Sequence, residues 1–372
     1  MTQNHFIPVA EPDLSELEKK YLNESFDSGW ISSTGKFVQR FEAEWADICQ
    51  TTYSLSVANG TVALHLILAA LDIGPGDEVI VPSMTFIASA NAVKYVGADP
   101  IFADVIGDTW CIDPVHAASL ITPKTKAIMA VHLYGNPCDM PALEDLCQRN
   151  GILLIEDAAE APFGEIHGRR VGSFGIAASF SFYGNKILAS GEGGAVTTSD
   201  IELFKKMKSL RGQGMDPQRR YYFTEIGFNF RLTNMQCALL CAQIERAEKM
   251  LEAREQVYKV YDHYLKEHEA LGFQSVLPGY TRSPWLYSLT LKDARLSARD
   301  ELMKVLESRG IETRPLFVPI HQLPPYLSGK QEDLPVTDFL GRTGISLPTS
   351  SKMTPETAKF VATEFLSALE TF

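Results

Sequence analysis

The sequence has few cysteines, a deficit of basic residues and no long apolar run. Its six cysteines are spread over 372 residues without a Cys-x-x-Cys pair, which favours reduced core thiols in the cytosol. With 34 basic against 46 acidic residues the net charge is −12, so a nucleic-acid partner is not expected. No apolar stretch approaches the roughly 18 residues of a membrane span, and the N-terminus shows no secretory signal. We therefore expect a cytoplasmic protein without a membrane partner.

Several motifs of common enzyme classes are also missing. No Gly-x-Gly-x-x-Gly opens a helix, so the fingerprint of a Rossmann dinucleotide site is absent. The pair Gly35-Lys36 lacks both the upstream glycine and the following Ser or Thr of a P-loop. Helical metal-ligand pairs such as His-Glu-x-x-His are absent and the eight histidines are scattered, so we expect no metal site.

What is present is an alternation of apolar runs and amphipathic stretches from residue 52 onward. Expected strands cover 53–57, 78–82, 101–105, 127–132 and 152–155, and expected helices cover 62–71, 88–96, 113–121 and 140–150. Strands that alternate with helices indicate βαβ units and a mostly parallel sheet covered on both faces. The predicted fold class is α/β.

The pattern changes after Gly175. Two further strands are expected at 177–183 and 195–198, followed by a long amphipathic helix from Gln243 to about Leu271. Beyond it, strands at 285–291 and 312–316 and helices at 297–309 and 354–369 predict a smaller α+β domain. We therefore divide the chain into an N-terminal arm with a large α/β domain (1–245) and a linking helix with a small domain (246–372).

Three local features are candidates for a site. Asn59-Gly60-Thr61 lies between a strand and a helix N-terminus, where free N–H groups suit a phosphate, although a plain turn has the same sequence. Asp157 follows a buried strand, so it either faces a cleft at the carboxyl end of the sheet or caps a helix. Lys186 lies in a glycine-rich loop, where a lysine is more often a solvated charge.

Pyridoxal 5′-phosphate (PLP) catalysis needs all three features together. The phosphate needs a helix N-terminus, the pyridine nitrogen needs an acidic partner to stay protonated, and the aldehyde needs a lysine for a Schiff base. The order along the chain is a phosphate loop at 59–61, a carboxylate at 157 and a lysine at 186.

The sequence resembles the DegT/StrS-type sugar aminotransferases, which have fold type I of the PLP enzymes. The resemblance runs from about residue 8 to the C-terminus. It is carried by NGTVALHL (59–66), GPGDEVIVPSMTFIASANAV (74–93), KAIMAVHLYG (126–135), IEDAAEA (155–161), SFSFYGNKILASGEGG (179–194) and GFNFRLTNMQCAL (227–239). It implies a large domain with a mostly parallel central sheet and a smaller C-terminal domain.

The resemblance also implies roles for single residues. Lys186 would form the Schiff base and move the proton, and its presence favours transamination over the dehydration that relatives with histidine at this position catalyse. Asp157 would pair with the pyridine nitrogen. The other cofactor-binding residues would be Gly60, Thr61 and Ser181 at the phosphate, Phe86 on the ring, Glu160 near the 3′-oxygen, and Asn229 from a partner subunit. The last role implies a homodimer with shared active sites.

Glu160 departs from the pattern of many relatives, which have Gln or His there. A carboxylate beside a phenolate-like oxygen is unfavourable unless one of the two is protonated. The protonation state of Glu160 is therefore left open.

The resemblance implies glutamate as amino donor, with 2-oxoglutarate as its product, and a keto-sugar as acceptor. The segments WISSTGKF (30–37), RGQGMDPQRRYY (211–222) and ETRPLFVPIHQLPPY (312–326) are similar to perosamine synthases, which aminate GDP-4-keto-6-deoxymannose. The candidate residues for the nucleotide sugar are Arg219, Arg220, His321 and Tyr326, although a solvated turn explains the two arginines equally well. The alternatives are a UDP- or dTDP-linked hexose, a free keto-sugar acid, or a PLP-binding regulator without turnover.

Overall fold

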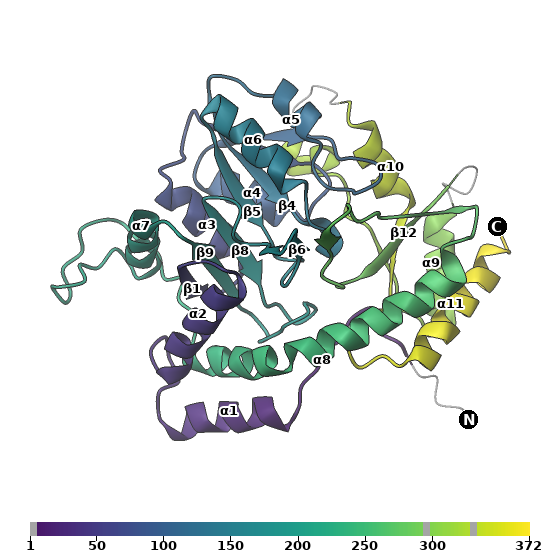
Figure 1. Ribbon diagram of the computed structural model, residues 1–372, viewed down its shortest axis with the longest axis horizontal. Coiled ribbons are helices and arrows are strands. Elements are labelled where there is room, and N and C mark those ends of the chain that lie inside the picture. The colour runs from purple at the N-terminus through teal and green to yellow at the C-terminus, as the bar shows by residue number, and fades with distance from the viewer. Residues whose placement is uncertain (1–5, 293–297, 328–332) are drawn as a thin grey trace.

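The larger part of the molecule is built around a seven-stranded sheet (Figure 1). The structure is a computed structural model and describes residues 6–292, 298–327 and 333–372. The strands in their order across the sheet are β1 (Tyr53–Val57), β9 (Gly194–Thr198), β8 (Ala177–Ser181), β5 (Leu153–Asp157), β4 (Thr125–Val131), β2 (Glu78–Pro82) and β3 (Asp99–Ala103). The strands from β8 to β3 pair in parallel, whereas β9 runs antiparallel to both β1 and β8. The predicted mostly parallel α/β sheet is confirmed.

Helices cover both faces of this sheet because alternate strand residues point to opposite sides. Val79 and Val81 of β2 pack in one core with α3 (Gly60–Ala70), α4 (Ala88–Tyr95) and α7 (Ile201–Arg211). Ile80, between them, packs on the opposite face with α5 (Pro114–Ser119) and α6 (Met140–Asn150).

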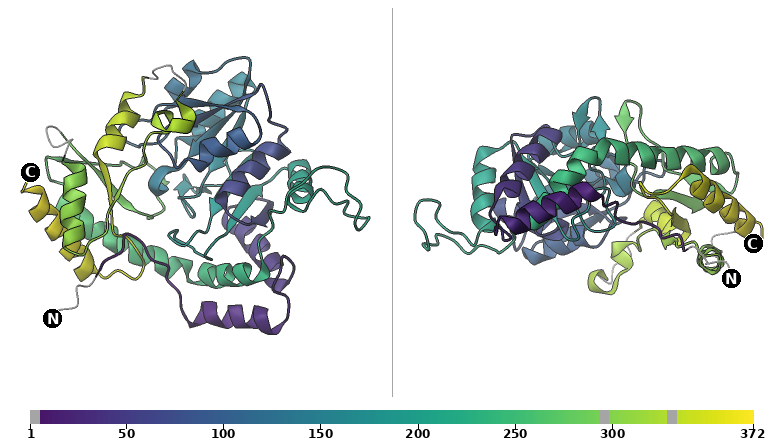
Figure 2. Two further views of the ribbon diagram at one scale, coloured as in Figure 1. Left: turned by 180° about the vertical axis from the view of Figure 1, so that it is seen from behind. Right: turned by 90° about the horizontal axis from the view of Figure 1, so that it is seen from below.

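The helix α8 (Asn234–Leu265) leads from the large sheet to the C-terminal part (Figures 1 and 2). A capping box of Thr233 and Gln236 starts it. Its C-terminal half packs against a smaller antiparallel sheet, whose strands in order are β10 (Leu271–Phe273), β12 (Tyr287–Leu291), β14 (Gly344–Leu347) and β13 (Arg314–Pro315). The helices α9 (Arg299–Ser308) and α11 (Pro355–Leu369) complete this core, and α10 (Pro335–Thr343) leads into β14. A third, short sheet contains β11 (Tyr280–Thr281), β6 (Glu165–Ile166) and β7 (Arg169–Arg170).

The N-terminal segment crosses from the small part to the large one. Ile7 forms a β-bridge with Ile311, and the N–H of Thr349 donates to the carbonyl of Val9 at 2.9 Å. Two helices follow, α1 (Glu16–Asp27) alongside α8 and α2 (Lys36–Ile48) between α8 and β1. The boundary drawn after residue 245 falls inside α8 and stays a prediction. No helix in the described ranges is long and apolar enough to cross a bilayer.

Candidate active site

A cavity of about 470 Å³ lies where the carboxyl ends of the parallel strands meet the C-terminal part of the chain. Seven residues that the sequence predicts as cofactor-binding or catalytic line it: Gly60, Thr61, Phe86, Asp157, Glu160, Ser181 and Lys186. A larger hollow of about 1120 Å³ lies along α8 and contains none of these residues. The smaller cavity is therefore the candidate active site.

One wall of the cavity is the first turn of α3. Asn59 caps the helix, and its Oδ1 accepts the N–H of Val62 at 3.0 Å. The N–H groups of Gly60 and Thr61, in the first turn, have no intrahelical acceptor and are available to an anion. A Cβ on Gly60 would lie 2.9 Å from the Cβ of Ser181 at the end of β8, so only glycine lets the helix and the strand end approach this closely. Two backbone donors and one hydroxyl thus form an anion cradle.

Asp157 ends β5 on the cavity side and is 6% exposed. Its Oδ2 accepts the hydroxyl of Ser89 at 2.7 Å, and its Oδ1 accepts the N–H of Ala159 at 3.2 Å. These two hydrogen bonds fix the orientation of the Asp157 carboxylate. A fixed orientation suits a carboxylate that pairs with a cationic group in the cavity.

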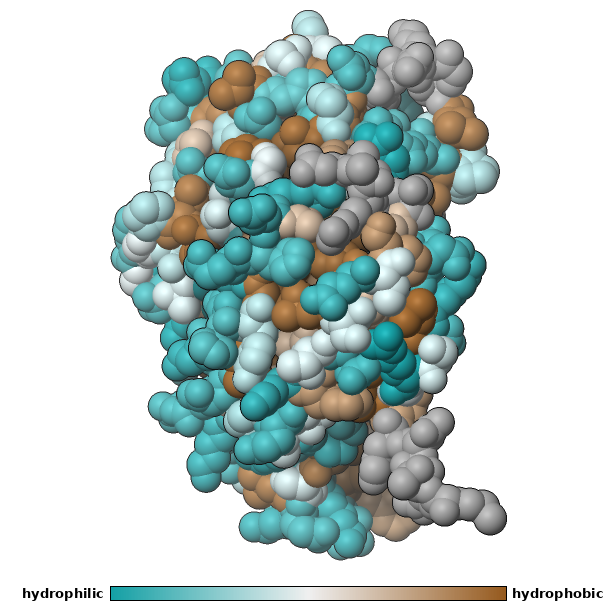
Figure 3. All heavy atoms as spheres, turned by 90° about the vertical axis from the view of Figure 1, so that its right-hand side faces the viewer, coloured by the Kyte–Doolittle hydropathy of each residue, from teal (hydrophilic) through white to brown (hydrophobic). Residues whose placement is uncertain are grey.

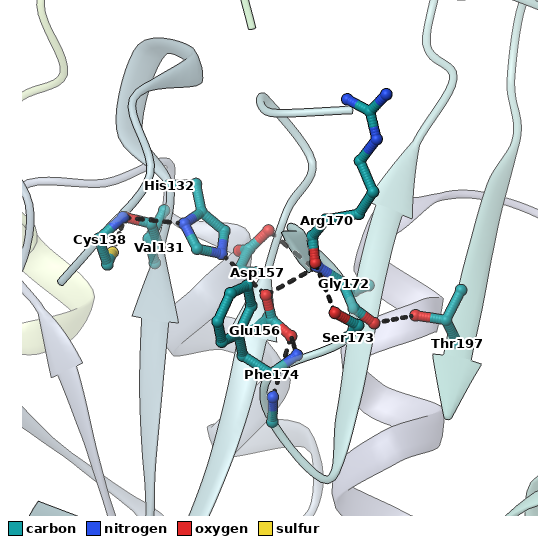
Figure 4. Close-up of polar contacts among 12 residues, drawn as sticks. Val131, His132, Cys138, Glu156, Asp157, Arg170, Gly172, Ser173, Phe174 and Thr197 are labelled. Carbon is teal, nitrogen blue, oxygen red and sulfur yellow. Dashed lines mark hydrogen bonds and ion pairs between the residues drawn. The ribbon is translucent and has the colours of Figure 1, made fainter. Parts of the chain in front are cut away.

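The neighbouring Glu156 is fully buried and lies at the centre of a second network (Figure 4). Its carboxylate accepts the backbone N–H groups of Gly172 (2.8 Å), Phe174 (2.7 Å) and Gly175 (3.0 Å), and it lies 3.2 Å from Nε2 of His132. Nδ1 of His132 accepts the N–H of Cys138 at 3.0 Å, so the proton of a neutral ring sits on Nε2 and points to Glu156. Successive strand residues point to opposite faces. Glu156 therefore anchors the strand end on which Asp157 faces the cavity.

Lys186 extends into the cavity from the loop after β8. Its Nζ lies 3.7 Å from Oε1 of Glu160, and Oε2 of Glu160 accepts the N–H of Tyr134 at 2.8 Å. Burial raises the pKa of Glu160 to about 6, against the opposing charge of Lys186. Burial also lowers the pKa of Lys186, against the charges of Glu160 and Asp157. The two shifts bring the pKa values of Glu160 and Lys186 closer together, which favours proton transfer between the two groups.

Sequence reasoning missed most of the aromatic residues that line the cavity, and it missed Arg314. Tyr134 stacks on Trp285 (ring centroids 5.9 Å apart) and on Phe317 (5.4 Å). Phe86, which was predicted to stack on the cofactor ring, is 55% exposed and lies 5.8 Å from Phe317. Arg314 of β13 also lines the cavity. The only sequence signal that pointed to a functional role for Arg314 and Phe317 was their place in the segment 312–326, which is similar to perosamine synthases. No sequence signal pointed to Trp285.

Three predicted residues lie in the segment 212–233, the middle of which projects away from the body after α7 (Figures 1 and 2). Arg219 lies over the ring of Tyr222 (4.3 Å to its centroid) and Arg220 over that of Tyr221 (4.9 Å). Asn229 is exposed and lies at the base of the segment, where it forms an antiparallel β-bridge with Gly212. None of the three lines the cavity of its own chain. Their predicted roles would need a partner subunit and stay predictions.

His321 and Tyr326 do not line the cavity either. Nδ1 of His321 lies 2.7 Å from the hydroxyl of Ser83, and its Nε2 lies 3.2 Å from Asp338. The hydroxyl of Tyr326 donates to Asn91 at 2.6 Å. These contacts join the loop 317–327 to the strand end of β2 and to α4. The substrate roles of both residues also stay predictions.

The amine, the buried acid and the anion cradle converge on one cavity, and together they fit PLP. The cradle would hold the phosphate, Asp157 the pyridine nitrogen and Lys186 the aldehyde carbon. The close approach of Gly60 to Ser181 brings the backbone donors and the hydroxyl that would bind the phosphate to the same place. On this fold, the set defines a PLP-dependent enzyme of fold type I.

The profile of the DegT/DnrJ/EryC1/StrS aminotransferase family matches residues 12–366. The chain belongs to this family of PLP-dependent sugar aminotransferases. It is 46% identical over 356 residues to a GDP-perosamine synthase of Caulobacter vibrioides, covering 94% of each chain. The crystal structure of the aminotransferase TlmJ from Streptoalloteichus hindustanus superimposes with a TM-score of 0.93 at 30% identity, covering 98% of this chain and 99% of that one. A putative sugar aminotransferase of Streptococcus pneumoniae in its PLP form gives 0.94 at 26% identity, covering 99% of both chains.

Proposed function

We propose that this sugar aminotransferase moves an amino group from glutamate to the 4-keto group of GDP-4-keto-6-deoxymannose. The observation that carries the reaction class is the convergence of Lys186, Asp157 and the anion cradle on one cavity. The sugar is supported by the identity of 46% to a GDP-perosamine synthase over almost the whole chain.

The residues that line the cavity then take the following roles in the reaction. Gly60, Thr61 and Ser181 bind the phosphate, and Asp157 keeps the pyridine nitrogen protonated. The bound cofactor supplies an electron sink that stabilises negative charge on the carbon losing its proton. Nζ of Lys186 takes that proton from the donor and returns it when the acceptor sugar is aminated. Phe86 contacts the cofactor ring, and Tyr134 and Phe317 exclude water from this region.

Arg314 supplies the guanidinium that the donor's carboxylate needs. Lys186 is the only other basic residue among those that line the cavity in the described part of the chain, and its amine is committed to the reaction. A guanidinium binds a carboxylate through two parallel hydrogen bonds. Glu312, 3.4 Å from Arg314, is a loose partner that a donor carboxylate can replace.

The active form is a homodimer in which the segment 212–233 reaches the partner's cavity. This segment exposes Tyr221 (74%), Phe223 (53%) and Ile226 (93%), an apolar set that a monomer would leave in water. The small-domain side in Figure 3 instead mixes hydrophilic residues with scattered apolar ones. In the dimer, Asn229 contacts the phosphate, and Arg219 and Arg220 are available to the diphosphate of the nucleotide sugar.

A panel of keto-sugar nucleotides tests the sugar. The protein with PLP and glutamate is incubated with GDP-4-keto-6-deoxymannose, and in parallel with the UDP- and dTDP-linked 4-keto-6-deoxyhexoses. We expect 2-oxoglutarate and a GDP-linked amino sugar by mass spectrometry, with kcat/KM at least tenfold above that for the other nucleotides. Lys186→Ala is the inactive control. A higher kcat/KM with a UDP- or dTDP-linked sugar would reject the proposed sugar and keep the reaction class.

A further inference from the structure

The amine of Lys186 lies against an aromatic face as well as against a carboxylate. Its Nζ is 3.8 Å from the centroid of the Trp285 ring and 3.7 Å from Oε1 of Glu160. A cation at this distance over an indole is attracted by the negative face of the ring, most strongly where water is excluded. The side chain of Lys186 is only 12% exposed. The ring is therefore in the right place to stabilise the ammonium form.

Trp285 is held by three contacts, two of them made by its ring and one by its backbone. Its Nε1–H donates to the carbonyl of Asn185, the residue before the lysine, at 2.8 Å. Its face stacks on Tyr134 with planes 16° apart. The backbone carbonyl of Trp285 accepts a hydrogen bond from Nη1 of Arg254 at 2.9 Å. The position of the ring relative to Lys186 is thus fixed by groups on both parts of the molecule.

Arg254, on α8, is unusual among the charged residues. It is 1% exposed, and its Nη1 donates to the carbonyls of Trp285 and Thr349 (3.2 Å). Within the ranges that the structure describes, its Nε has no partner and no carboxylate forms an ion pair with it, although Asp13 is near enough to act on its charge. A buried charge without a counter-ion is costly, and an apolar residue would fill the same space at a lower cost. What the guanidinium adds is a directional hold on two carbonyls, one of them that of Trp285.

We propose that the Trp285 face, together with Glu160, is the resting site of the free Lys186 ammonium, and that Arg254 is the positioning residue that holds the Trp285 backbone and so keeps the ring there. This inference rests on the proposed role of Lys186. In a transamination the lysine is free during the part of the cycle in which the cofactor carries the amino group. In contact with Trp285 and Glu160, it stays in the cavity with the proton that it must return. The other polar groups around it are Asp157, Glu192, Arg314, Tyr134 and Tyr183.

The protonation of Lys186 in the cofactor-free protein tests this directly. The protein is acylated with trace acetic anhydride between pH 6 and 11, and the Lys186 peptide is quantified by mass spectrometry. In Trp285→Leu, loss of the ring removes stabilisation of the ammonium, so the midpoint of labelling falls by about 0.5 to 1 pH unit. Below the wild-type midpoint, labelling of Lys186 rises about three- to tenfold. Trp285→Phe restores most of the difference.

Two further proteins keep the test valid if Trp285→Leu folds poorly. Fluorinated tryptophan at position 285 weakens the negative face of the ring without changing its shape, so the midpoint falls stepwise with the number of fluorines. Arg254→Met shifts the midpoint in the same direction. Trp45→Leu is the control, because Trp45 is equally buried but does not line the cavity, and it leaves the midpoint unchanged.

An unchanged midpoint in Trp285→Leu and in the fluorinated proteins would overturn the inference, and a lower melting temperature alone would show only a structural role for Trp285. Because the labelling uses no cofactor, its result is independent of whether the protein aminates a GDP-linked sugar. Failure of the sugar panel and failure of this inference are therefore distinguishable.

Discussion

At the scale of single residues, Glu160 shows how the cavity sets a protonation state. Burial favours its neutral form, and the backbone N–H of Tyr134 and the charge of Lys186 offset this only in part. Because the pKa is about 6 in the folded protein, against an ordinary value of 4.5, the unfolded chain loses its proton first as pH rises. The carboxyl therefore stabilises the fold fully below about pH 4.5, and this contribution is lost as pH rises to about 6 and above.

This loss of stability with rising pH gives a prediction for Glu160→Gln, which mimics the neutral form of the carboxyl group. We expect the variant to be more stable than the wild type at pH 8 by about 2 kcal/mol, on the basis of 1.36 kcal/mol for each unit of pKa shift. The gain shrinks as pH falls from 6 towards 4.5. Urea unfolding of the cofactor-free proteins at several values between pH 5 and 8 measures it. A gain that does not vary with pH would mean that Glu160 is ionised to the same extent in both states.

At the scale of helices and strands, the buried Glu156 joins β4, β5 and the turn before β8 (Figure 4). In Glu156→Gln, the amide would turn an NH2 group towards backbone donors and leave buried N–H groups without an acceptor. Each such group costs about 1–3 kcal/mol, so we expect the free energy of unfolding to fall by about 2–4 kcal/mol. Affinity for PLP also falls, because Asp157 occupies the same strand end.

Glu165→Gln is the matched control for that change. Glu165 is a partly exposed residue of β6, the strand that follows β5 in the sequence, and its carboxylate lies 3.4 Å from Nη1 of Arg170. An exposed ion pair of this kind contributes only about 0–1 kcal/mol. Chemical denaturation and PLP titration by fluorescence compare the two variants. Equal losses in both would show that the Glu156 network has no special part in stability.

The bounds of the helices and strands show how much of the fold the sequence could predict. The buried strands β1, β2, β4 and β5 agree with their predicted ranges to within two residues, because a short apolar run between turn residues has few alternatives. The start of α8 was placed nine residues too late, at 243 instead of 234. Its first turns are buried on several sides, at Cys237, Ala238, Leu240, Cys241 and Ala242, so they show no amphipathic period.

Site residues also differ in whether their sequence pattern has few alternatives. That Lys186, Asp157 and Gly60 line one cavity was predictable, because PLP chemistry demands a particular residue type at each position. Trp285 and Phe317 were not, because an aromatic residue in an apolar run has the same pattern whether it lines a cavity or fills a core. Arg254 could not be predicted for a similar reason, since its function depends on carbonyls 31 and 95 residues away in sequence.

At the scale of the whole molecule, the segment 212–233 with its projecting middle part is the feature that a single chain leaves unexplained. If Asn229 completes the cavity of a partner, Lys186→Ala and Asn229→Ala damage different halves of a shared site. Each variant alone gives homodimers with two damaged sites. A mixed dimer has one site with both lesions and one with neither, so we expect subunit exchange in a 1:1 mixture to restore up to about a quarter of wild-type activity.

The mixture is compared with each variant alone after mild dissociation and reassociation, and tagged subunits confirm that mixed dimers form. Lys186→Ala mixed with Asp157→Asn is the matched control, because both residues line the cavity of one chain and every mixed dimer then has one lesion in each site. Restoration in the first mixture together with none in the second places Asn229 in the partner's site. If mixed dimers form and neither mixture regains activity, Asn229 acts within its own chain, and the apolar residues of the projecting segment serve the contact between subunits without completing a site.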